Sequence, residues 1–264
     1  MLKDRKCKMT YIKSKDNEKF KKIKSLLLAK KRSKEKKYLA EGLRTVELAL
    51  EHGADIDMLI LREGTEFELD TRDINLYTLS KDLYDQISDT ENSQGIMAVI
   101  RMKNFSKEDY NPDKYKKILI MDRVQDPGNV GTIIRTADAM GFDLICMTKG
   151  CVDVYNPKVV RSAMGSSFYI DVLIGSQEEI FDLLKSSGVQ IVSSYLATDN
   201  YYDQSSYAES CALVVGNEAN GINDFWIDNS DILVKIPMYG KAESFNVAIS
   251  AALLMSRVIV SNSK

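Results

Sequence analysis

Apolar and polar positions alternate along the first hundred residues with the periods of short helices and strands. Helical spacing of the apolar residues predicts helices at 17–31, 43–51 and 80–87. Short apolar runs predict strands at 58–61, 75–78 and 95–101. Residues 1–16 hold little apolar material, and residues 30–37 form a charged break. The pattern predicts a flexible basic N-terminus at 1–16, followed by a small α/β domain at 17–102.

The second half of the chain follows a polar stretch at 103–116, which contains Asn111-Pro112 and is predicted to be a linker. Apolar runs after it predict strands at 118–122, 144–148, 168–174, 190–195, 211–216 and 231–236. The segments between and after them predict helices at 129–140, 159–167, 178–186 and 245–260. Regular alternation of strand and helix is typical of a parallel sheet covered on both faces. We therefore predict a second α/β domain at 117–264.

The composition is that of a chain able to form two hydrophobic cores. It has 264 residues, of which 44% are hydrophobic, and a mean hydropathy of -0.23. No run approaches the ~18 to 20 apolar residues that span a bilayer. The lysine-rich start also lacks the apolar core of a secretory signal. We therefore expect a cytoplasmic protein with no membrane span.

The cysteine pattern argues against a metal or disulfide framework. Cys7, Cys146, Cys151 and Cys211 are scattered, and the chain has a single histidine, His52. The two nearest cysteines are too far apart for a CxxC motif. A zinc site would need a denser cluster of such ligands. No metal is expected.

The formal net charge of -2 hides an asymmetry. Residues 1–40 contain 16 Lys/Arg and 4 Asp/Glu, a balance of +12, which leaves -14 on the other 224 residues. A basic end on an acidic chain favours a polyanionic partner met through the N-terminus. A solvated, lysine-rich helix explains the same charge, and charge alone does not decide between the two.

Three segments of the predicted second domain place Gly, Asn or Pro where an apolar strand ends, which is where ligands bind in open parallel sheets. The first is 122–137, in which Asn129 is a candidate N-cap and the helix start offers backbone N–H groups to an anion. Arg135 follows six residues later. The Gly128-x-x-Gly131 spacing matches neither a Walker loop nor GxGxxG. Taken alone, this segment fits a functional loop and a plain turn equally well.

The second segment, 213–222, follows a buried strand. It places Glu218 between Gly216 and Gly221. A carboxylate bracketed by two glycines thus lies at the end of a strand, where a ligand would bind. The structural alternative is a turn whose glutamate caps the next helix.

The third segment, 236–252, has a loop with Pro and Gly, then Ser244 and Asn246 ahead of a helix rich in small residues. Small side chains allow that helix to lie close against its neighbours. The structural alternative is a hydrophobic C-terminal helix with a serine N-cap.

Together, and in this order, the three segments resemble the SpoU (TrmH) family of RNA ribose methyltransferases, within the SPOUT superfamily. The matching patterns are N-x-G-x-x-x-R-T-A at 129–137, G-x-E-x-x-G at 216–221 and I-P-M-x-G-x-x-x-S-x-N-V-A at 236–248. Residues 156–165 also look like the family's, and 38–42 look like the start of its substrate-binding domain. The resemblance covers the whole second domain and, more loosely, the first. The family has Leu where this chain has Phe245.

The resemblance implies a C-terminal SPOUT α/β domain with a mainly parallel sheet and a deep trefoil knot, preceded by a small α/β substrate-binding domain. The segment from about residue 236 would thread through a loop near residue 216, an exception to the rule that chains are unknotted. The implied cofactor is S-adenosyl-L-methionine, held in the knot by Leu213, Gly216, Asn217, Ile236, Met238, Phe245 and Val247. The implied active site consists of Asn129, Arg135, Glu218, Ser244 and Asn246. The resemblance also implies a homodimer whose subunits meet at the substrate.

Methyl transfer from a sulfonium needs no metal, but it needs an aligned nucleophile and removal of a proton. A neutral Arg135 at pH 7 would cost roughly 7 to 9 kcal/mol, so arginine is a poor base. We interpret Arg135 as the group that binds the neighbouring phosphate and stabilises the developing alkoxide, while the RNA phosphate or a water accepts the proton. Glu218 is expected to orient Arg135 or a hydroxyl. Ser244 and Asn246 are expected to hold the loop and the substrate.

An RNA substrate gives the basic N-terminus a function, because its lysines would make the salt-dependent phosphate contacts that position RNA. Tyr38 is a candidate for stacking on a base, although a residue beside Leu39 is more typical of a core. The two-domain arrangement favours ribosomal RNA, 23S in particular, over transfer RNA. One alternative is a catalytically silent RNA-binding or ribosome-assembly protein, against which the retained active-site residues argue. A nucleotide-dependent oxidoreductase would need a GxGxxG motif, and the chain has none.

Overall fold

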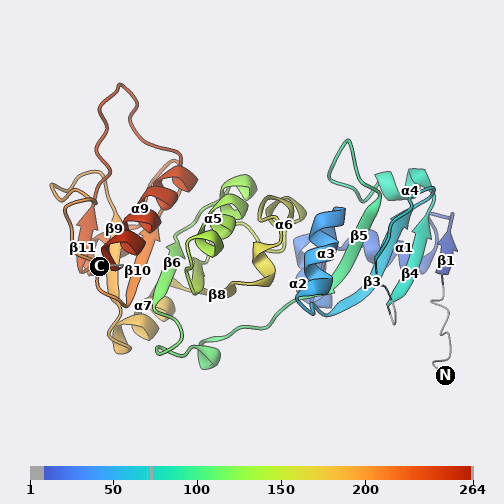
Figure 1. The fold of residues 1–264 in the computed structure, drawn as a ribbon, viewed down its shortest axis with the longest axis horizontal. Helices are drawn as coiled ribbons and strands as arrows, with labels where there is room; N and C mark the ends of the chain where they lie inside the picture. The colour runs from blue at the N-terminus through green and yellow to red at the C-terminus, as the bar shows by residue number, and fades with distance from the viewer. Residues whose placement is uncertain (1–8, 70, 72–73, 263–264) are drawn as a thin grey trace. The chain divides into compact units, whose positions relative to one another are not determined.

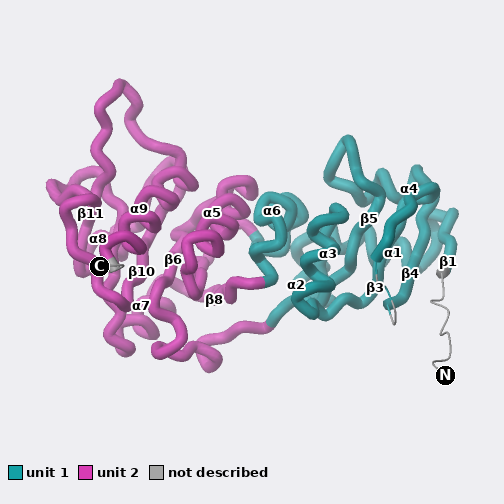
Figure 2. Tube along the Cα trace, viewed as in Figure 1, with its two compact units in different colours: residues 1–103, 153–168 teal, residues 104–152, 169–264 magenta. Residues whose placement is uncertain are grey.

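The computed structural model describes residues 9–69, 71 and 74–262. Contacts divide the chain into two compact units (Figure 2). Residues 1–103 and 153–168 form the first unit, and residues 104–152 and 169–264 form the second. Each unit has its own sheet and its own buried core. The chain therefore leaves the second unit at residue 153 and returns to it after residue 168.

The first unit is built on a mixed sheet in the order β1-β4-β3-β5-β2 (Figure 1). The strands are β1 (Met9–Ile12), β2 (Lys37–Glu41), β3 (Ile56–Arg62), β4 (Asn75–Leu79) and β5 (Ile96–Arg101). The helices are α1 (Glu18–Ser25), α2 (Ala29–Glu35), α3 (Leu43–Glu51), α4 (Lys81–Asp85) and α6 (Pro157–Ser162), with a 3-10 turn at Ser166–Phe168. β1, β4 and β3 are parallel, whereas β5 is antiparallel to β3 and β2. The three strands predicted at 58–61, 75–78 and 95–101 are β3, β4 and β5.

The start of the described chain differs from the predicted flexible segment. Residues 9–12 form β1, which pairs in parallel with β4 at the edge of the sheet. Ile12 is buried in the core of the first unit. One buried side chain is too weak a signal for a periodicity argument, so only the pairing with β4 identifies this strand. Residues 1–8 lie outside the described residues.

The charged break predicted at 30–37 is largely the helix α2. Its Arg32 side chain is only 2% exposed and pairs with Asp153, with nitrogen and oxygen 2.6 Å apart. The same guanidinium donates to the backbone carbonyls of Leu26 and Leu27. Burying a charged guanidinium is costly unless it is paired and hydrogen-bonded, and only the folded unit brings these partners to Arg32. Sequence periodicity cannot distinguish such a residue from the exposed lysines around it.

Residues 153–168 complete the core of the first unit. The rings of Tyr38 and Tyr155 lie 4.7 Å apart, and the Tyr155 hydroxyl donates to the Lys103 carbonyl. Tyr38 is buried. The hypothesis that Tyr38 stacks on a base is therefore wrong, because its ring is enclosed by Tyr155 and the core around it.

The second unit is built on a sheet in the order β11-β9-β10-β6-β7-β8, and every pair of neighbouring strands is parallel. The strands are β6 (Lys117–Met121), β7 (Leu144–Thr148), β8 (Asp171–Gly175), β9 (Gln190–Ser194), β10 (Cys211–Val215) and β11 (Ile232–Val234). The helices are α5 (Pro127–Ala139), α7 (Gln177–Ser186), α8 (Asp224–Asn229) and α9 (Val247–Asn262), with a 3-10 turn at Lys107–Asp109. The predicted α/β class with a parallel sheet is confirmed.

Both faces of the parallel sheet are covered. Ile118 and Ile120 of β6 pack in a core with residues of α7 and with the fully buried Trp226 of α8. Elsewhere α5 packs against α9, and α9 packs against β10 (Figure 1). Strands buried on both faces have no polar side to expose, which explains their continuous apolar runs.

The strand register brings the functional segments together. β10 pairs with β6 so that Val215 lies beside Met121, and β10 also pairs with β9. Parallel strands end at the same edge of a sheet, so the loops after β6, β9 and β10 leave the sheet side by side. Two of the three motif segments identified in the sequence begin at this edge.

Candidate active site

Helix α5 begins two residues earlier than predicted, with a different cap. Asp126 is the N-cap, and its carboxylate accepts a hydrogen bond from the backbone N–H of Asn129 at 2.8 Å. Pro127 occupies the first helical turn, where its missing N–H is not needed. The prediction that Asn129 is the N-cap is wrong, because Asp126 has that role. The Asn129 side chain is consequently available for contacts outside the helix.

One residue from each motif segment joins a chain of side-chain hydrogen bonds. Asn129 Nδ2 donates to Glu218 Oε1 at 3.0 Å, and Asn246 Nδ2 donates to Asn129 Oδ1 at 2.9 Å. Glu218 and Asn246 lie 89 and 117 positions from Asn129 in the sequence. The structure therefore brings together three of the five predicted active-site residues.

The groups around Glu218 donate hydrogen bonds to its carboxylate. Its carboxylate also accepts from the backbone N–H groups of Gln125 and Asp126, at 3.3 and 3.1 Å. Burial by itself would raise the pKa of this carboxyl, but the hydrogen bonds from Asn129 and the backbone outweigh burial and lower the pKa below 4.5. Glu218 is thus ionised at neutral pH. It does not cap the next helix, because the N-cap of α8 is Asn223.

A fully buried carboxylate, Asp122, supports the loop that carries Glu218. Asp122 accepts from the Thr148 hydroxyl at 3.0 Å and from the backbone N–H of Asn223 at 2.8 Å. The Arg123 guanidinium contacts the same carboxylate at 3.1 and 3.2 Å and the Gly221 carbonyl at 3.4 Å. A buried charge needs such partners to be stable. Neither Asp122 nor Arg123 is among the predicted site residues, although a carboxylate directly after an apolar strand was a usable signal.

Gly216 makes the turn into this loop possible. Asn217 and Gly221 exchange two backbone hydrogen bonds of 2.9 Å, which closes the loop tightly. A Cβ at Gly216 would lie 2.2 Å from the carbonyl carbon of Gly221, far inside contact distance. The Asn217 side chain donates to the Arg123 carbonyl at 2.9 Å. The loop after β10 is therefore fixed to the loop after β6.

The third motif segment contains the cap and the first turns of α9. The Asn246 side-chain oxygen accepts from the backbone N–H of Ala248 at 2.9 Å, so Asn246 performs the capping that the structural alternative assigned to a serine. The helix begins at Val247, two residues later than predicted. Because Asn246 also donates to Asn129, the start of α9 is fixed to the start of α5.

A cavity of about 540 Å³ lies at the carboxyl ends of β9 and β10. Its walls include five of the residues predicted to hold the cofactor: Gly216, Asn217, Ile236, Phe245 and Val247. Glu218 and Ser244 also line it. Of the other two predicted cofactor residues, Leu213 is buried within β10 and Met238 is half-buried, and neither lines the cavity.

Arg135 and Ser244 stand outside the hydrogen-bonded chain. Both are exposed, Arg135 on α5 and Ser244 in the loop before α9. Within the described ranges, no hydrogen bond or ion pair is formed by either side chain. In this structure Glu218 is oriented by Asn129 and backbone N–H groups rather than by Arg135.

The described residues contain neither a membrane-spanning helix nor a metal-binding cluster. No helix among them is both long and apolar enough to cross a bilayer. No group of three or more His, Cys, Asp or Glu side chains among them is arranged to hold a metal ion.

Comparison with known families identifies both halves of the chain. The model of the SpoU rRNA Methylase family matches residues 116–256, more than half of the chain. The model of the MRM3-like substrate binding domain matches residues 17–98. The chain belongs to the SpoU rRNA methylase family. The predicted resemblance is confirmed, and all three motif segments lie within the match.

Relatives of this SpoU methylase are similar over almost the whole chain. It is 37% identical to the 23S rRNA (guanosine(2553)-2'-O)-methyltransferase RlmP of Bacillus subtilis, over 94% of this chain and 98% of that protein. It is 29% identical to the 23S rRNA (uridine(2479)-2'-O)-methyltransferase of Streptomyces viridochromogenes, over 87% and 84% of the two chains. The AdoMet-bound rRNA methyltransferase from Sinorhizobium meliloti superposes with a TM-score of 0.85 at 28% identity, covering 95% and 97%. The similarity thus includes both units.

Proposed function

We propose that this protein is an S-adenosylmethionine-dependent methyltransferase that methylates a ribose 2′-hydroxyl of 23S ribosomal RNA. The observation that carries the proposal is the joining of three distant motif segments by Asn129, Glu218 and Asn246, beside a cavity at the strand ends. Relatives named as 23S rRNA 2'-O-methyltransferases support the reaction and the RNA class. The family matches at 17–98 and 116–256 support an RNA-binding domain at 17–102, a linker at 103–116 and a methyltransferase domain at 117–264.

The cavity fits the methyl donor. Its volume lies in the range of about 300–1,000 Å³ that is typical of small-molecule sites. Gly216 leaves backbone groups accessible, and Ile236, Phe245 and Val247 supply apolar walls. When bound, S-adenosylmethionine supplies a methyl group on a sulfonium that needs no metal to be transferred. We assign Leu213 and Met238 supporting positions behind this wall.

The side chains of this protein align the acceptor and stabilise charge. Glu218 fixes Asn129, which in turn fixes Asn246, so that the three loops keep one geometry. Arg135 binds a phosphate beside the target ribose and stabilises negative charge on the 2′-oxygen as its proton leaves for the RNA phosphate or a water. Ser244 orients the loop at the cavity edge.

We further propose a homodimer, a trefoil knot and a cytoplasmic location. Helix α9 packs against α5 and β10 yet exposes Ile249 and Val260, each about half accessible. Phe245, at the edge of the cavity, is also exposed. Covering these apolar side chains with a second copy places the partner close to the cavity. The knot is supported by the similarity to the SpoU structures, and the location by the rRNA substrate.

The test is methyl transfer from labelled S-adenosylmethionine to RNA, followed by mapping of 2′-O-methyl groups. We expect one modified nucleotide in 23S rRNA lacking prior modification, and none in transfer RNA. Label in transfer RNA alone would overturn the rRNA assignment. Binding of the donor with no transfer to any RNA would favour the catalytically silent alternative.

A further inference from the structure

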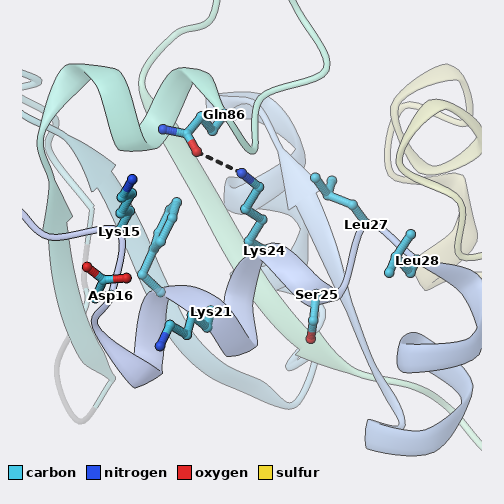
Figure 3. Close-up of a pocket in the computed structure, with 9 residues that line it drawn as sticks. Lys15, Asp16, Lys21, Lys24, Ser25, Leu27, Leu28 and Gln86 are labelled. Atoms are coloured by element: carbon cyan, nitrogen blue, oxygen red, sulfur yellow. Dashed lines mark hydrogen bonds between the residues drawn. The ribbon is translucent and has the colours of Figure 1, made fainter.

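The first unit has a second hollow, of about 490 Å³, that the reaction does not explain (Figure 3). It lies along α1, between the loop that precedes this helix and the end of α4. Lys15, Lys21 and Lys24 line one part of it, and Leu27 and Leu28 line another. The hollow therefore combines cationic and apolar walls.

The lysines of this cationic wall can exchange their present hydrogen-bond and ion-pair partners for a ligand. Lys24 donates to the side-chain oxygen of Gln86 at 2.7 Å (Figure 3). Lys21 pairs with Glu18 at 2.9 Å, and both contacts lie at the surface. Exposed pairs of this kind contribute little to stability. Asp16 provides the only carboxylate among the residues lining the hollow. Positive charge is thus in excess here, as an anionic ligand requires.

The apolar wall is partly exposed to solvent. Leu28 is 61% exposed, although Phe20 beneath the hollow is fully buried in the core. The Lys24 ammonium lies 6.0 Å from the centre of the Phe20 ring. An exposed leucine next to lysines offers a surface on which a base or ribose can pack while its phosphates meet the ammonium groups.

The opposite side of α1 has a smaller excess of positive charge. There Lys19, Lys22 and Lys37 line a smaller hollow of about 160 Å³, together with the carboxylates of Glu35 and Asp57. Asp57 is already paired with Lys37 at 2.8 Å. Three lysines and one carboxylate therefore line the first hollow, whereas three lysines and two carboxylates line the hollow on the opposite side of the helix.

We propose that the hollow at Lys15, Lys21, Lys24, Leu27 and Leu28 holds an unpaired nucleotide of the RNA substrate. The lysines contact the phosphates on both sides of it, and the leucines contact its base or ribose. Unpaired RNA is commonly bound in cationic grooves whose side chains, most often aromatic, contact the bases, and here the two leucines take that position. The proposal rests on the proposed function, since it takes the partner to be the RNA that is methylated.

The experiment compares two double variants of the full-length protein. Lys21→Ala with Lys24→Ala removes two of the three lysines of the cationic wall, and Lys19→Ala with Lys22→Ala is the control with the same charge change on the same helix. Binding to a 23S rRNA transcript and to a single-stranded oligouridine is measured over a range of salt concentrations. We expect the first variant to bind about tenfold more weakly and its salt slope to fall by about 1.4, at about 0.7 per lost phosphate contact. The control should change less than about twofold.

A third variant, Leu28→Ser, tests the apolar wall. We expect weaker binding with an unchanged salt slope, because no phosphate contact is lost. Equal losses of RNA binding in the two lysine variants would overturn the proposal. Full RNA binding by the Lys21/Lys24 variant would also overturn it, even if that variant no longer bound a ribosomal protein. Donor binding to the second unit is measured in parallel. If wild-type protein binds RNA through this hollow but transfers no methyl group, the proposed reaction fails and the site remains.

Discussion

The carboxylate of Asp122 accepts a hydrogen bond from the backbone N–H of Asn223 at 2.8 Å, across 101 residues of sequence. Asp122 directly follows β6, and Asn223 follows the loop that carries Glu218. The contact therefore fixes the position of one motif segment relative to another.

Asp122→Asn should destabilise the second unit and weaken donor binding. An amide nitrogen would face the donors of Thr148, Arg123 or Asn223, and the charge opposite Arg123 is lost. We expect about 2 to 4 kcal/mol less stability in chemical denaturation and a higher KM for S-adenosylmethionine. Asp126→Asn is the matched control, because asparagine is an equally good N-cap. Equal effects of the two changes would contradict the supporting role of Asp122.

Glu218→Gln should reduce turnover and remove a pH-dependent part of the stability. Glutamine presents an N–H₂ group to a site made of donors, so we expect about tenfold lower kcat/KM. The folded pKa of Glu218 lies below its unfolded value of 4.5. Its contribution is therefore present above pH 4.5 and is lost as the pH falls through the lowered folded pKa. Melting temperatures of the two proteins should converge in that acid range, and a constant difference would count against the argument.

Gly216→Ala should disrupt the loop after β10. The new Cβ would overlap the Gly221 backbone, which cannot move without breaking the bonds between Asn217 and Gly221. We expect a loss of about 2 kcal/mol or more in stability and loss of donor binding by calorimetry. Gly240→Ala is the control, since nothing lies within 4 Å of a Cβ there.

Arg135→Ala should abolish most methyl transfer without unfolding the protein. Its side chain is exposed and makes no ion pair within the described part of the chain, so stability should change by less than about 0.5 kcal/mol. We expect kcat to fall by about 10² or more, because the charge near the developing alkoxide is lost. Arg135→Lys should restore part of the rate. Wild-type turnover by the alanine variant, with normal RNA and donor binding, would refute the role.

Arg32→Met should destabilise the first unit by about 3 kcal/mol, because it leaves the Asp153 carboxylate without its buried partner. Adding Asp153→Asn should recover part of that loss. Arg44→Met is the control, since Arg44 is exposed and pairs only at the surface. The measurement is chemical denaturation followed by a probe in the first unit. A double variant no more stable than Arg32→Met would show that the ion pair is not the cause.

The sequence by itself determined the class of the fold and the family. Continuous apolar runs such as 118–121 and 211–215 require burial on both faces, and this requirement alone predicts a parallel sheet. The three motifs likewise predicted Asn129, Glu218 and Asn246 as active-site residues. Local patterns have this power because burial and turn chemistry act on neighbouring residues.

Only the tertiary structure decided which groups meet. The cap of α5 is Asp126 rather than Asn129, and this difference leaves Asn129 able to join Glu218 to Asn246. The partner of Arg32 lies 121 residues away, so no local pattern could mark that arginine as buried. The short strand at residues 9–12 likewise depends on β4. These features arise from pairing between distant segments, whose energy exists only when the chain is folded.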